Sequence, residues 1–178
     1  KKRDKAILEL FFSTGLRVSE LTKLKIENIN LNKDPRHGGA SEFTVRGKGS
    51  KLRVVFLSPN AKKWIKEYSE ARHDTNPYLF ISHDRATSGR QGQNNLTPRS
   101  VQRIIQKYAR VAGITKRVTP HTMRHSYATD LLMNGADIRS VQAMLGHASI
   151  TTTQVYTHIT DQQLRDVYKA FHGRRRKD

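Results

Sequence analysis

The stretch Thr119-Pro-His-Thr-Met-Arg-His-Ser126 indicates how the second half of the chain begins to fold and what it can bind. A helix is expected over about 121–134. His121 and Arg124 are three residues apart, so both project from one face of this helix. A helix N-terminus offers free amide donors and a positive dipole, which favour a bound phosphate. The stretch therefore predicts a phosphate-binding helix.

Two groups downstream extend this pattern: His147, which ends the segment Leu145-Gly-His147, and then Tyr156. A phenolic oxygen can attack a phosphodiester, but an unperturbed phenol titrates near ~10, so at neutral pH it needs a base or surrounding cations. His121 is the candidate base, and His147 is a candidate donor to the phosphate. The pattern favours covalent phosphoryl transfer on nucleic acid without a metal.

Arg17 is a second candidate phosphate ligand, in the upstream segment Thr14-Gly-Leu-Arg-Val-Ser-Glu-Leu21. A guanidinium can donate two parallel hydrogen bonds to phosphate oxygens. Arg17 and Arg124 together would stabilise the negative charge that spreads over the non-bridging oxygens during transfer. The residues alone leave another interpretation open, in which Arg17 is only a buried ion-pair partner of Glu20.

Lys48 is the candidate general acid. It lies in the basic segment Gly47-Lys-Gly-Ser-Lys51, between β-branched and aromatic runs at 43–46 and 52–56 that predict a β-hairpin. Attack by a phenol expels a sugar alkoxide, a poor leaving group that needs a proton. A lysine on a flexible turn can supply this proton, and Lys51 on the same turn is the alternative donor.

Helical periodicity covers most of the remaining chain, so the sequence predicts an α+β fold that is mostly helical, with one small antiparallel β-hairpin. The expected helices lie at about 4–13, 17–24, 61–71, 97–112, 121–134, 138–145, 151–158 and 161–171. In the fourth of these, the expected buried stripe is Val101, Ile104, Ile105, Tyr108 and Val111. The polar stretches 28–39 and 82–95 are expected to be loops, and the basic tail 174–177 to be disordered.

The composition indicates a negatively charged partner. The 178 residues carry a formal net charge of +18, and neither 43–66 nor 85–129 contains an acidic residue. Such a surface attracts a polyanion, with nucleic acid favoured and anionic lipid a distant second. The absence of cysteine excludes disulfides and thiolate metal sites, and no apolar run approaches the length of a membrane span. These features are compatible with a reducing cytoplasm.

Together, these motifs resemble those of the tyrosine recombinases. The resemblance rests on the 14–21 helix, the Gly-Lys-Gly turn, His121-x-x-Arg124, Leu-Gly-His147, and Tyr156 nine residues later. The segments 121–129 and 146–158 look most like the Xer and phage-integrase branch, and the resemblance covers residues 4 to about 171.

The resemblance implies a DNA strand transferase of the site-specific recombinase type, with the catalytic-domain fold of that family. In such an enzyme the tyrosine attacks a DNA phosphate, leaving a 3′-phosphotyrosyl link and a free 5′-hydroxyl, and a 5′-hydroxyl of the partner duplex reverses the reaction. No ATP, metal or other cofactor is implied. The implied catalytic residues are Arg17, Lys48, His121, Arg124, His147 and Tyr156, and Glu20 is implied to brace them.

The resemblance also implies a domain organisation. Residues 1–171 correspond to the catalytic domain, and 172–178 to a flexible basic tail. Family members carry a separate amino-terminal core-binding domain, to which nothing here corresponds, so we expect an isolated catalytic domain that is monomeric by itself. Family members form homo- or hetero-tetramers on double-stranded DNA, and their terminal helix commonly docks into a neighbouring protomer. We expect 161–171 to dock in the same way. We also expect the protein to act in the cytoplasm, on the DNA of the nucleoid, and not at a membrane.

Some residues and functions allow other interpretations. His121 and His125, four residues apart, could form half a zinc site, but no third ligand is in view, so we expect His125 to be a core or supporting histidine. Tyr127 is expected to pack, and His172 to lie in the tail without a role. A type IB topoisomerase, which shares the chemistry, and a DNA-binding module without catalysis are the alternative functions.

Overall fold

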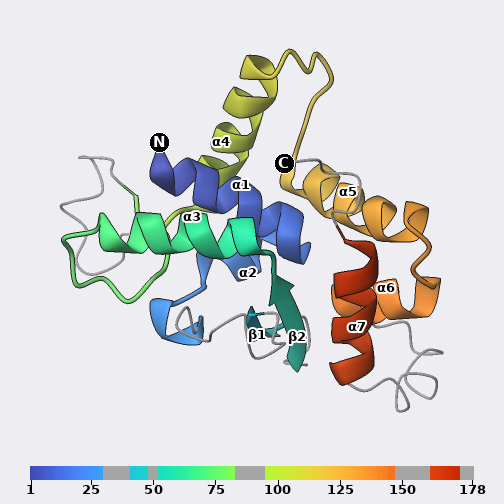
Figure 1. Ribbon diagram of the computed structural model, residues 1–178. Coiled ribbons are helices and arrows are strands. Elements are labelled where there is room, and N and C mark those ends of the chain that lie inside the picture. The colour runs from blue at the N-terminus through green and yellow to red at the C-terminus, as the bar shows by residue number, and fades with distance from the viewer. Residues whose placement is uncertain (30–40, 48–51, 83–94, 147–160, 173–178) are drawn as a thin grey trace.

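The computed structural model describes residues 1–29, 41–47, 52–82, 95–146 and 161–172 (Figure 1). In chain order the elements are α1 (Lys2–Thr14), α2 (Val18–Thr22), the 3-10 turn η1 (Ile26–Asn28), β1 (Ser41–Arg46), β2 (Leu52–Leu57), α3 (Pro59–Glu70), α4 (Pro98–Val111), α5 (Pro120–Met133), α6 (Ile138–Leu145) and α7 (Asp161–Phe171). The described residues form mainly helices and one two-stranded antiparallel sheet, which confirms the predicted fold class. The helix expected over 151–158 lies outside the described residues.

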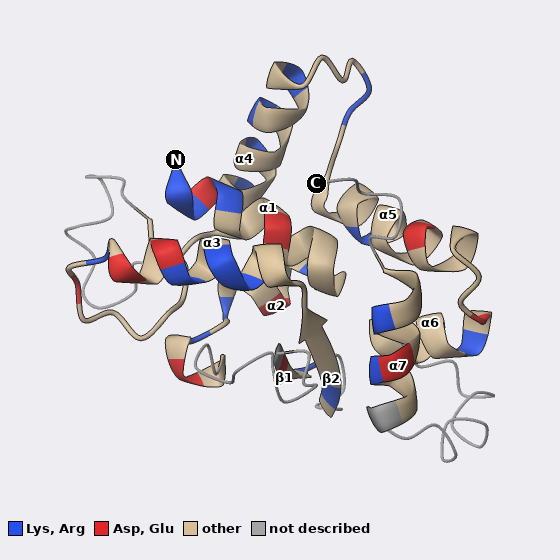
Figure 2. Ribbon diagram, viewed as in Figure 1, with Lys and Arg blue, Asp and Glu red and all other residues tan. Residues whose placement is uncertain are grey.

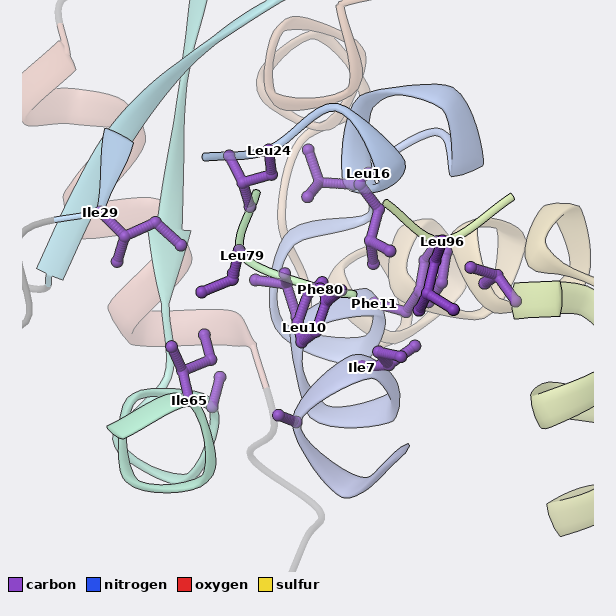
Figure 3. Packing of buried hydrophobic residues seen from close by; sticks show 14 of the residues in the cluster. Ile7, Leu10, Phe11, Leu16, Leu24, Ile29, Ile65, Leu79, Phe80 and Leu96 are labelled. Carbon is purple, nitrogen blue, oxygen red and sulfur yellow. The ribbon is translucent and has the colours of Figure 1, made fainter. Parts of the chain in front are cut away.

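Helix α1 forms the centre of the main hydrophobic core. Its fully buried side chains recur at helical spacing and are Ala6, Ile7, Leu10 and Phe11. They pack against buried residues of α3 and α4 and of the connection that precedes α4 (Figure 3). Gly15 ends the helix in the left-handed conformation, with φ 58° and ψ 28°, and its N–H donates to the carbonyl of Phe11.

The hairpin lies between the main core and a second buried cluster. β1 and β2 pair in antiparallel register, with Val45 opposite Arg53. Successive side chains of a strand point to opposite faces. Val55 and Leu57 belong to the main core, whereas Phe56 belongs to the second cluster. Both faces of β2 are therefore covered over 55–57, whereas Leu52 at the start of the strand is 66% exposed.

Helices α5, α6 and α7 build the second cluster, and Figure 1 shows them on the opposite side of β2 from α3. Tyr127 and Leu131 of α5 pack with Met144 of α6 and with Leu164 and Tyr168 of α7, and all five side chains are buried. Helix α7 thus packs within its own chain. Its docking into a neighbouring protomer stays a prediction.

The structure contradicts the expectations for Val111 and His172. Val111 is 76% exposed, because the last turn of α4 extends away from the other helices, and Ala109 is buried in its place (Figure 1). The side chain of His172, expected in a tail, is only 3% exposed and packs against aromatic rings. Its ring centroid lies 5.1 Å from that of Tyr127 and 4.8 Å from that of Tyr168, and its Nδ1 lies 3.1 Å from a carboxylate oxygen of Asp130.

Candidate active site

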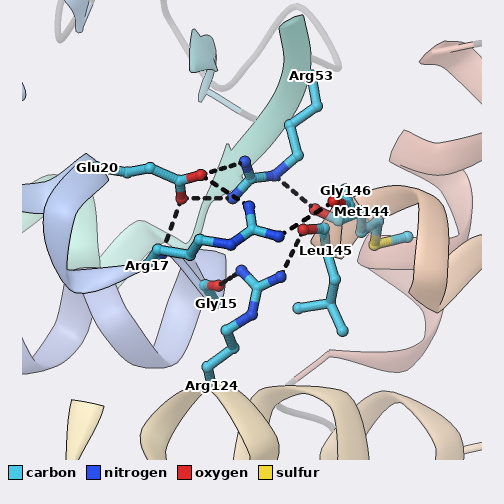
Figure 4. A network of polar contacts seen from close by, with 8 residues as sticks. All are labelled: Gly15, Arg17, Glu20, Arg53, Arg124, Met144, Leu145 and Gly146. Atoms are coloured by element: carbon cyan, nitrogen blue, oxygen red, sulfur yellow. Dashed lines mark hydrogen bonds and ion pairs between the residues drawn. The ribbon is translucent and has the colours of Figure 1, made fainter. Parts of the chain in front are cut away.

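Three arginine side chains meet at the C-terminal end of α6, where each donates a hydrogen bond to one of three consecutive backbone carbonyls (Figure 4). The bonds run from Arg53 Nε to Met144 O (3.0 Å), from Arg124 Nη2 to Leu145 O (2.5 Å) and from Arg17 Nη2 to Gly146 O (3.1 Å). The last carbonyls of a helix have no partner within the helix and carry the negative end of its dipole, so they attract cations. The end of α6 therefore gathers three guanidinium groups.

Arg124 is largely buried, with 7% of its surface exposed. It lies on α5, which has Thr119 as its N-cap and Pro120 in its first turn. Its Nη1 donates to the carbonyl of Gly15 at 2.6 Å. Burial and the nearby charges of two further arginines lower the pKa of Arg124 to about 10, so the side chain stays charged at neutral pH. A guanidinium has five N–H donors, so others remain after these two carbonyls are satisfied.

Arg17 and Glu20 stand at the start of α2. Arg17 is the N-cap, and the Glu20 carboxylate accepts hydrogen bonds from its backbone N–H at 2.8 Å and from its Nη1 at 3.0 Å. Such a bond from a residue at the third helical position to the N-cap amide is half of a capping box. The ion pair that the sequence left as an alternative is thus present. The Arg17 side chain is nevertheless 31% exposed, so a ligand can reach it.

Arg53 belongs to the same network, although no sequence motif singled it out. From β2, its Nη1 and Nη2 donate to the two carboxylate oxygens of Glu20, each at 2.8 Å. A signal was present in the alternation of the strand. Arg53 shares a face with Val55 and Leu57, both buried, and an arginine on a buried face requires a buried partner.

The network carries an excess of positive charge. Burial would raise the pKa of the Glu20 carboxyl, but hydrogen bonds from Arg53 and Arg17 outweigh it and hold that pKa at about 2, against an ordinary 4.5. Glu20 is therefore ionised at neutral pH, and its one negative charge faces the three positive charges of the arginines. The complementary ligand is an anion with several acceptor oxygens, which describes a phosphodiester.

Two glycines in the left-handed conformation allow the network to close. Gly15, at the end of α1, has φ +58°, and a Cβ there would lie 2.5 Å from a ring carbon of Tyr127. Gly146, at the end of α6, has φ +62°, and a Cβ there would lie 2.8 Å from Cδ of Arg53. Their carbonyls accept bonds from two of the arginines, so these glycines place acceptors where a larger residue would not fit.

An open cleft of about 920 Å³ borders the network. It is lined by residues of α2, η1 and the hairpin, and its basic side chains are those of Arg17, Lys23 and Arg46. Gly47 also lines the cleft and immediately precedes Lys48 in the sequence. The turn predicted to carry the general acid therefore begins at the wall of this cleft.

Of the predicted site residues, the structure brings Arg17, Glu20 and Arg124 into one network. Their catalytic roles stay predictions. Lys48, His147 and Tyr156 lie outside the described residues.

The two histidines of α5 are both exposed. His121 lies on the first turn of the helix, one turn before Arg124. His125 was expected to be a core or supporting histidine. It is not a core residue, because the buried face of α5 is formed by Arg124, Tyr127 and Leu131, and a supporting role stays a prediction. Among the described residues, no cluster of three or more His, Asp or Glu side chains could hold a metal ion. In the same ranges, no helix is both long and apolar enough to span a membrane.

Comparison with known proteins points to one family. The sequence model of the Phage integrase family matches residues 1–163. Tyrosine recombinase XerD of Listeria innocua is 44% identical over 179 residues, which cover 97% of this chain and 55% of that protein. The chain thus spans little more than half the length of this curated relative.

Solved structures show the same fold. The crystal structure of XerA recombinase matches with a TM-score of 0.70 and 35% identity, over 100% of this chain and 60% of that chain. The site-specific recombinase XerH, in a pre-cleavage complex bound to difH substrate, matches with a TM-score of 0.66 and 28% identity, over 89% of this chain and 43% of that chain.

Proposed function

Because this chain belongs to the phage integrase family, we propose that it performs the strand-cleaving and strand-joining chemistry of a site-specific DNA recombinase. Its substrate is a DNA phosphodiester and its partner is double-stranded DNA. The name of its relative XerD, a tyrosine recombinase, and the fold shared with XerA recombinase support this assignment.

The proposed reaction exchanges one phosphoester bond for another. The Tyr156 hydroxyl oxygen attacks phosphorus while His121 takes its proton, the bond to the 5′-oxygen breaks, and Lys48 protonates that oxygen. The products are a 3′-phosphotyrosyl link and a free 5′-hydroxyl. A 5′-hydroxyl of the partner strand then attacks the link and regenerates the phenol. Because the number of phosphoester bonds does not change, ATP is not required.

Arg17, Arg124 and His147 would bind the phosphate and stabilise the charge of the transition state. The observation that carries this proposal is the convergence of the first two at the end of α6, with a surplus of positive charge. Cationic donors of this kind supply the charge neutralisation for which other phosphoryl transferases use a metal. The chain also runs directly from Gly146, which accepts the bond from Arg17, into His147.

The surface charge supports duplex DNA as the partner. Helix α4 carries four exposed basic residues and no acidic one, and these are Arg99, Arg103, Lys107 and Arg110. In Figure 2 its ribbon accordingly shows blue segments and no red one. A row of basic side chains suits the regularly spaced phosphates of a duplex. The relative XerH, whose fold is similar, is bound to difH substrate.

On DNA, the proposed assembly is a homo- or hetero-tetramer in which α7 is exchanged between protomers. The contacts of Leu164 and Tyr168 with the second cluster would then form between chains. Deleting 161–178 tests the exchange: assembly on DNA that is unchanged by the deletion would argue against it.

Covalent trapping tests the chemistry. The chain is incubated with a duplex that carries a nick next to the cleavage site, so that the short 5′-hydroxyl fragment diffuses away and the reaction cannot reverse. A protein–DNA adduct that resists denaturant should form, equally well with and without a chelator.

Tyr156→Phe should abolish the adduct, while Tyr78→Phe, a change in a half-buried tyrosine of a connection, should leave it intact. No adduct with the wild-type chain, or an adduct that persists in Tyr156→Phe, would rule out the proposed chemistry.

A further inference from the structure

We propose that Arg53 is a positioning residue for strand transfer, which keeps Arg17 available to the DNA phosphate by neutralising Glu20. This inference rests on the proposed function. Arg53 is not among the residues that the family resemblance implies for catalysis. It acts through Arg17 and does not itself bind the phosphate.

Arg53 and Glu20 form a two-bond ion pair. Each terminal nitrogen of the guanidinium donates to a different carboxylate oxygen at 2.8 Å, the geometry that gives this pairing its strength. The two side chains are only 8% and 6% exposed, so water screens the pair weakly. Arg53 is therefore the main cation that offsets the charge of Glu20.

Arg17 is the cation that Glu20 would otherwise hold. In the present network Arg17 Nη1 makes one bond to the carboxylate at 3.0 Å, and Nη2 turns toward the carbonyl of Gly146. A buried carboxylate without its main partner requires another cation. Without Arg53, the Arg17 guanidinium would rotate into a two-bond pair with Glu20 and use the donors that a phosphate needs. Arg53 removes this competition.

Arg53 also fixes the backbone around the network. Its Nε donates to the carbonyl of Met144 at 3.0 Å, and its Cδ occupies the space where Gly146 lacks a side chain. On β2 it follows Leu52, directly after the turn that carries the candidate general acid. One side chain thus ties the strand after that turn to α2 and to the end of α6.

Single-turnover cleavage of the nicked duplex, at saturating protein, tests the proposal with Arg53→Met. Displacement of a catalytic group by about 1 Å can lower a rate by about 100-fold, so we expect adduct formation to slow by about 10- to 100-fold. The Kd for the duplex should change by less than about threefold, because Arg53 makes no contact with the phosphate.

The matched control is Arg72→Met. Arg72 is also buried, with 4% of its side chain exposed, and it donates to the carbonyls of Tyr78 and Leu79 in the connection after α3. Its loss should lower the midpoint of thermal unfolding and leave the cleavage rate per folded molecule within about twofold.

A second substitution separates competition for Arg17 from a loss of packing. In the double variant Glu20→Gln with Arg53→Met, no carboxylate competes for Arg17, so cleavage should be at least about fivefold faster than in Arg53→Met alone. A double variant that is no faster overturns the proposal. So does an Arg53→Met chain that cleaves as fast as the Arg72→Met control.

If Arg53→Met does not fold, the same comparison of cleavage rates is made with Arg53→Lys, alone and together with Glu20→Gln. Lysine keeps the charge but cannot form the two-bond pair. The wild-type result keeps the two proposals apart. No adduct with the wild-type chain contradicts the proposed function and the role of Arg53 with it. An adduct that the wild-type and Arg53→Met chains form equally fast contradicts the role of Arg53 alone.

Discussion

Replacing Glu20 by glutamine should remove a pH-dependent part of the stability of this chain. The pKa of the Glu20 carboxyl lies at about 2 in the folded protein, against an ordinary 4.5. A lowered pKa means that the ionised form favours the fold, so the contribution is complete above the unfolded pKa and is lost as the pH falls through the folded one. At ~1.36 kcal/mol per unit, the difference of 2.5 units gives at most about 3.4 kcal/mol at pH 7. At pH 3 the same relation leaves at most about 1.4 kcal/mol.

The assay is urea unfolding of the wild-type and Glu20→Gln chains at pH 7 and pH 3. Glutamine also leaves Arg53 without its charged partner, which lowers stability equally at both pH values, so the informative quantity is the change between them. We expect the free-energy difference between the two chains to shrink by about 1 to 2 kcal/mol from pH 7 to pH 3, allowing for solvent screening.

Glu27→Gln is the control for this measurement. Its carboxylate is 71% exposed and pairs with Lys25 at 3.2 Å, so the substitution should change stability by less than about 0.5 kcal/mol at either pH. A Glu20→Gln difference that stays the same at pH 7 and pH 3 would refute the reasoning that the arginines stabilise this carboxylate.

Three further predictions concern the packing and the charge. Gly15→Ala should lower the free energy of unfolding by about 3 kcal/mol or more, because it combines a positive φ with a clash against Tyr127. The control is Gly113→Ala, at φ +74° with no described atom within 4 Å of a Cβ. Urea unfolding should show a loss of only about 1 to 2 kcal/mol for this control. Tyr168→Phe should lower the free energy of unfolding by about 1 to 2 kcal/mol, because its buried hydroxyl forms a hydrogen bond with Ser13 Oγ at 2.8 Å. Tyr108→Phe should cost less, because the bond of Tyr108 to Asp4 is 3.3 Å long and partly exposed. Equal losses in the two variants would contradict this prediction. Affinity for duplex DNA should fall by at least about 100-fold between about 50 and 200 mM salt, and binding that is indifferent to salt would exclude the phosphate contacts.

The fold could be predicted where one local pattern decided it. The apolar face of 161–171 and the N-cap with proline at 97–98 each specify a helix by themselves, and α7 and α4 are found there. The prediction that Val111 is buried was wrong, because periodicity shows which face of a helix is apolar but not how far along that face the rest of the protein packs. The prediction that His172 lies in a tail was wrong, because its side chain packs against rings of α1, α5 and α7, and those of α1 and α5 are distant in the sequence.

The site was predictable only in part. Arg17, Glu20 and Arg124 could be singled out because each stands in a short motif whose chemistry suggests a phosphate ligand or its partner. Arg53 stands in no such motif, and its importance depends on meeting Glu20 and Met144, 33 and 91 residues away. The convergence at the end of α6 likewise could not be predicted, because backbone carbonyls have no sequence signature.

The central claim is that a phosphate held by these arginines becomes bonded to Tyr156. The most direct measurement is mass spectrometry of the peptides from the trapped adduct. We predict that the 156-containing peptide carries the nucleotide through a 3′-phosphate on the phenolic oxygen. A nucleotide on another residue, or attached through a 5′-phosphate, would contradict this account.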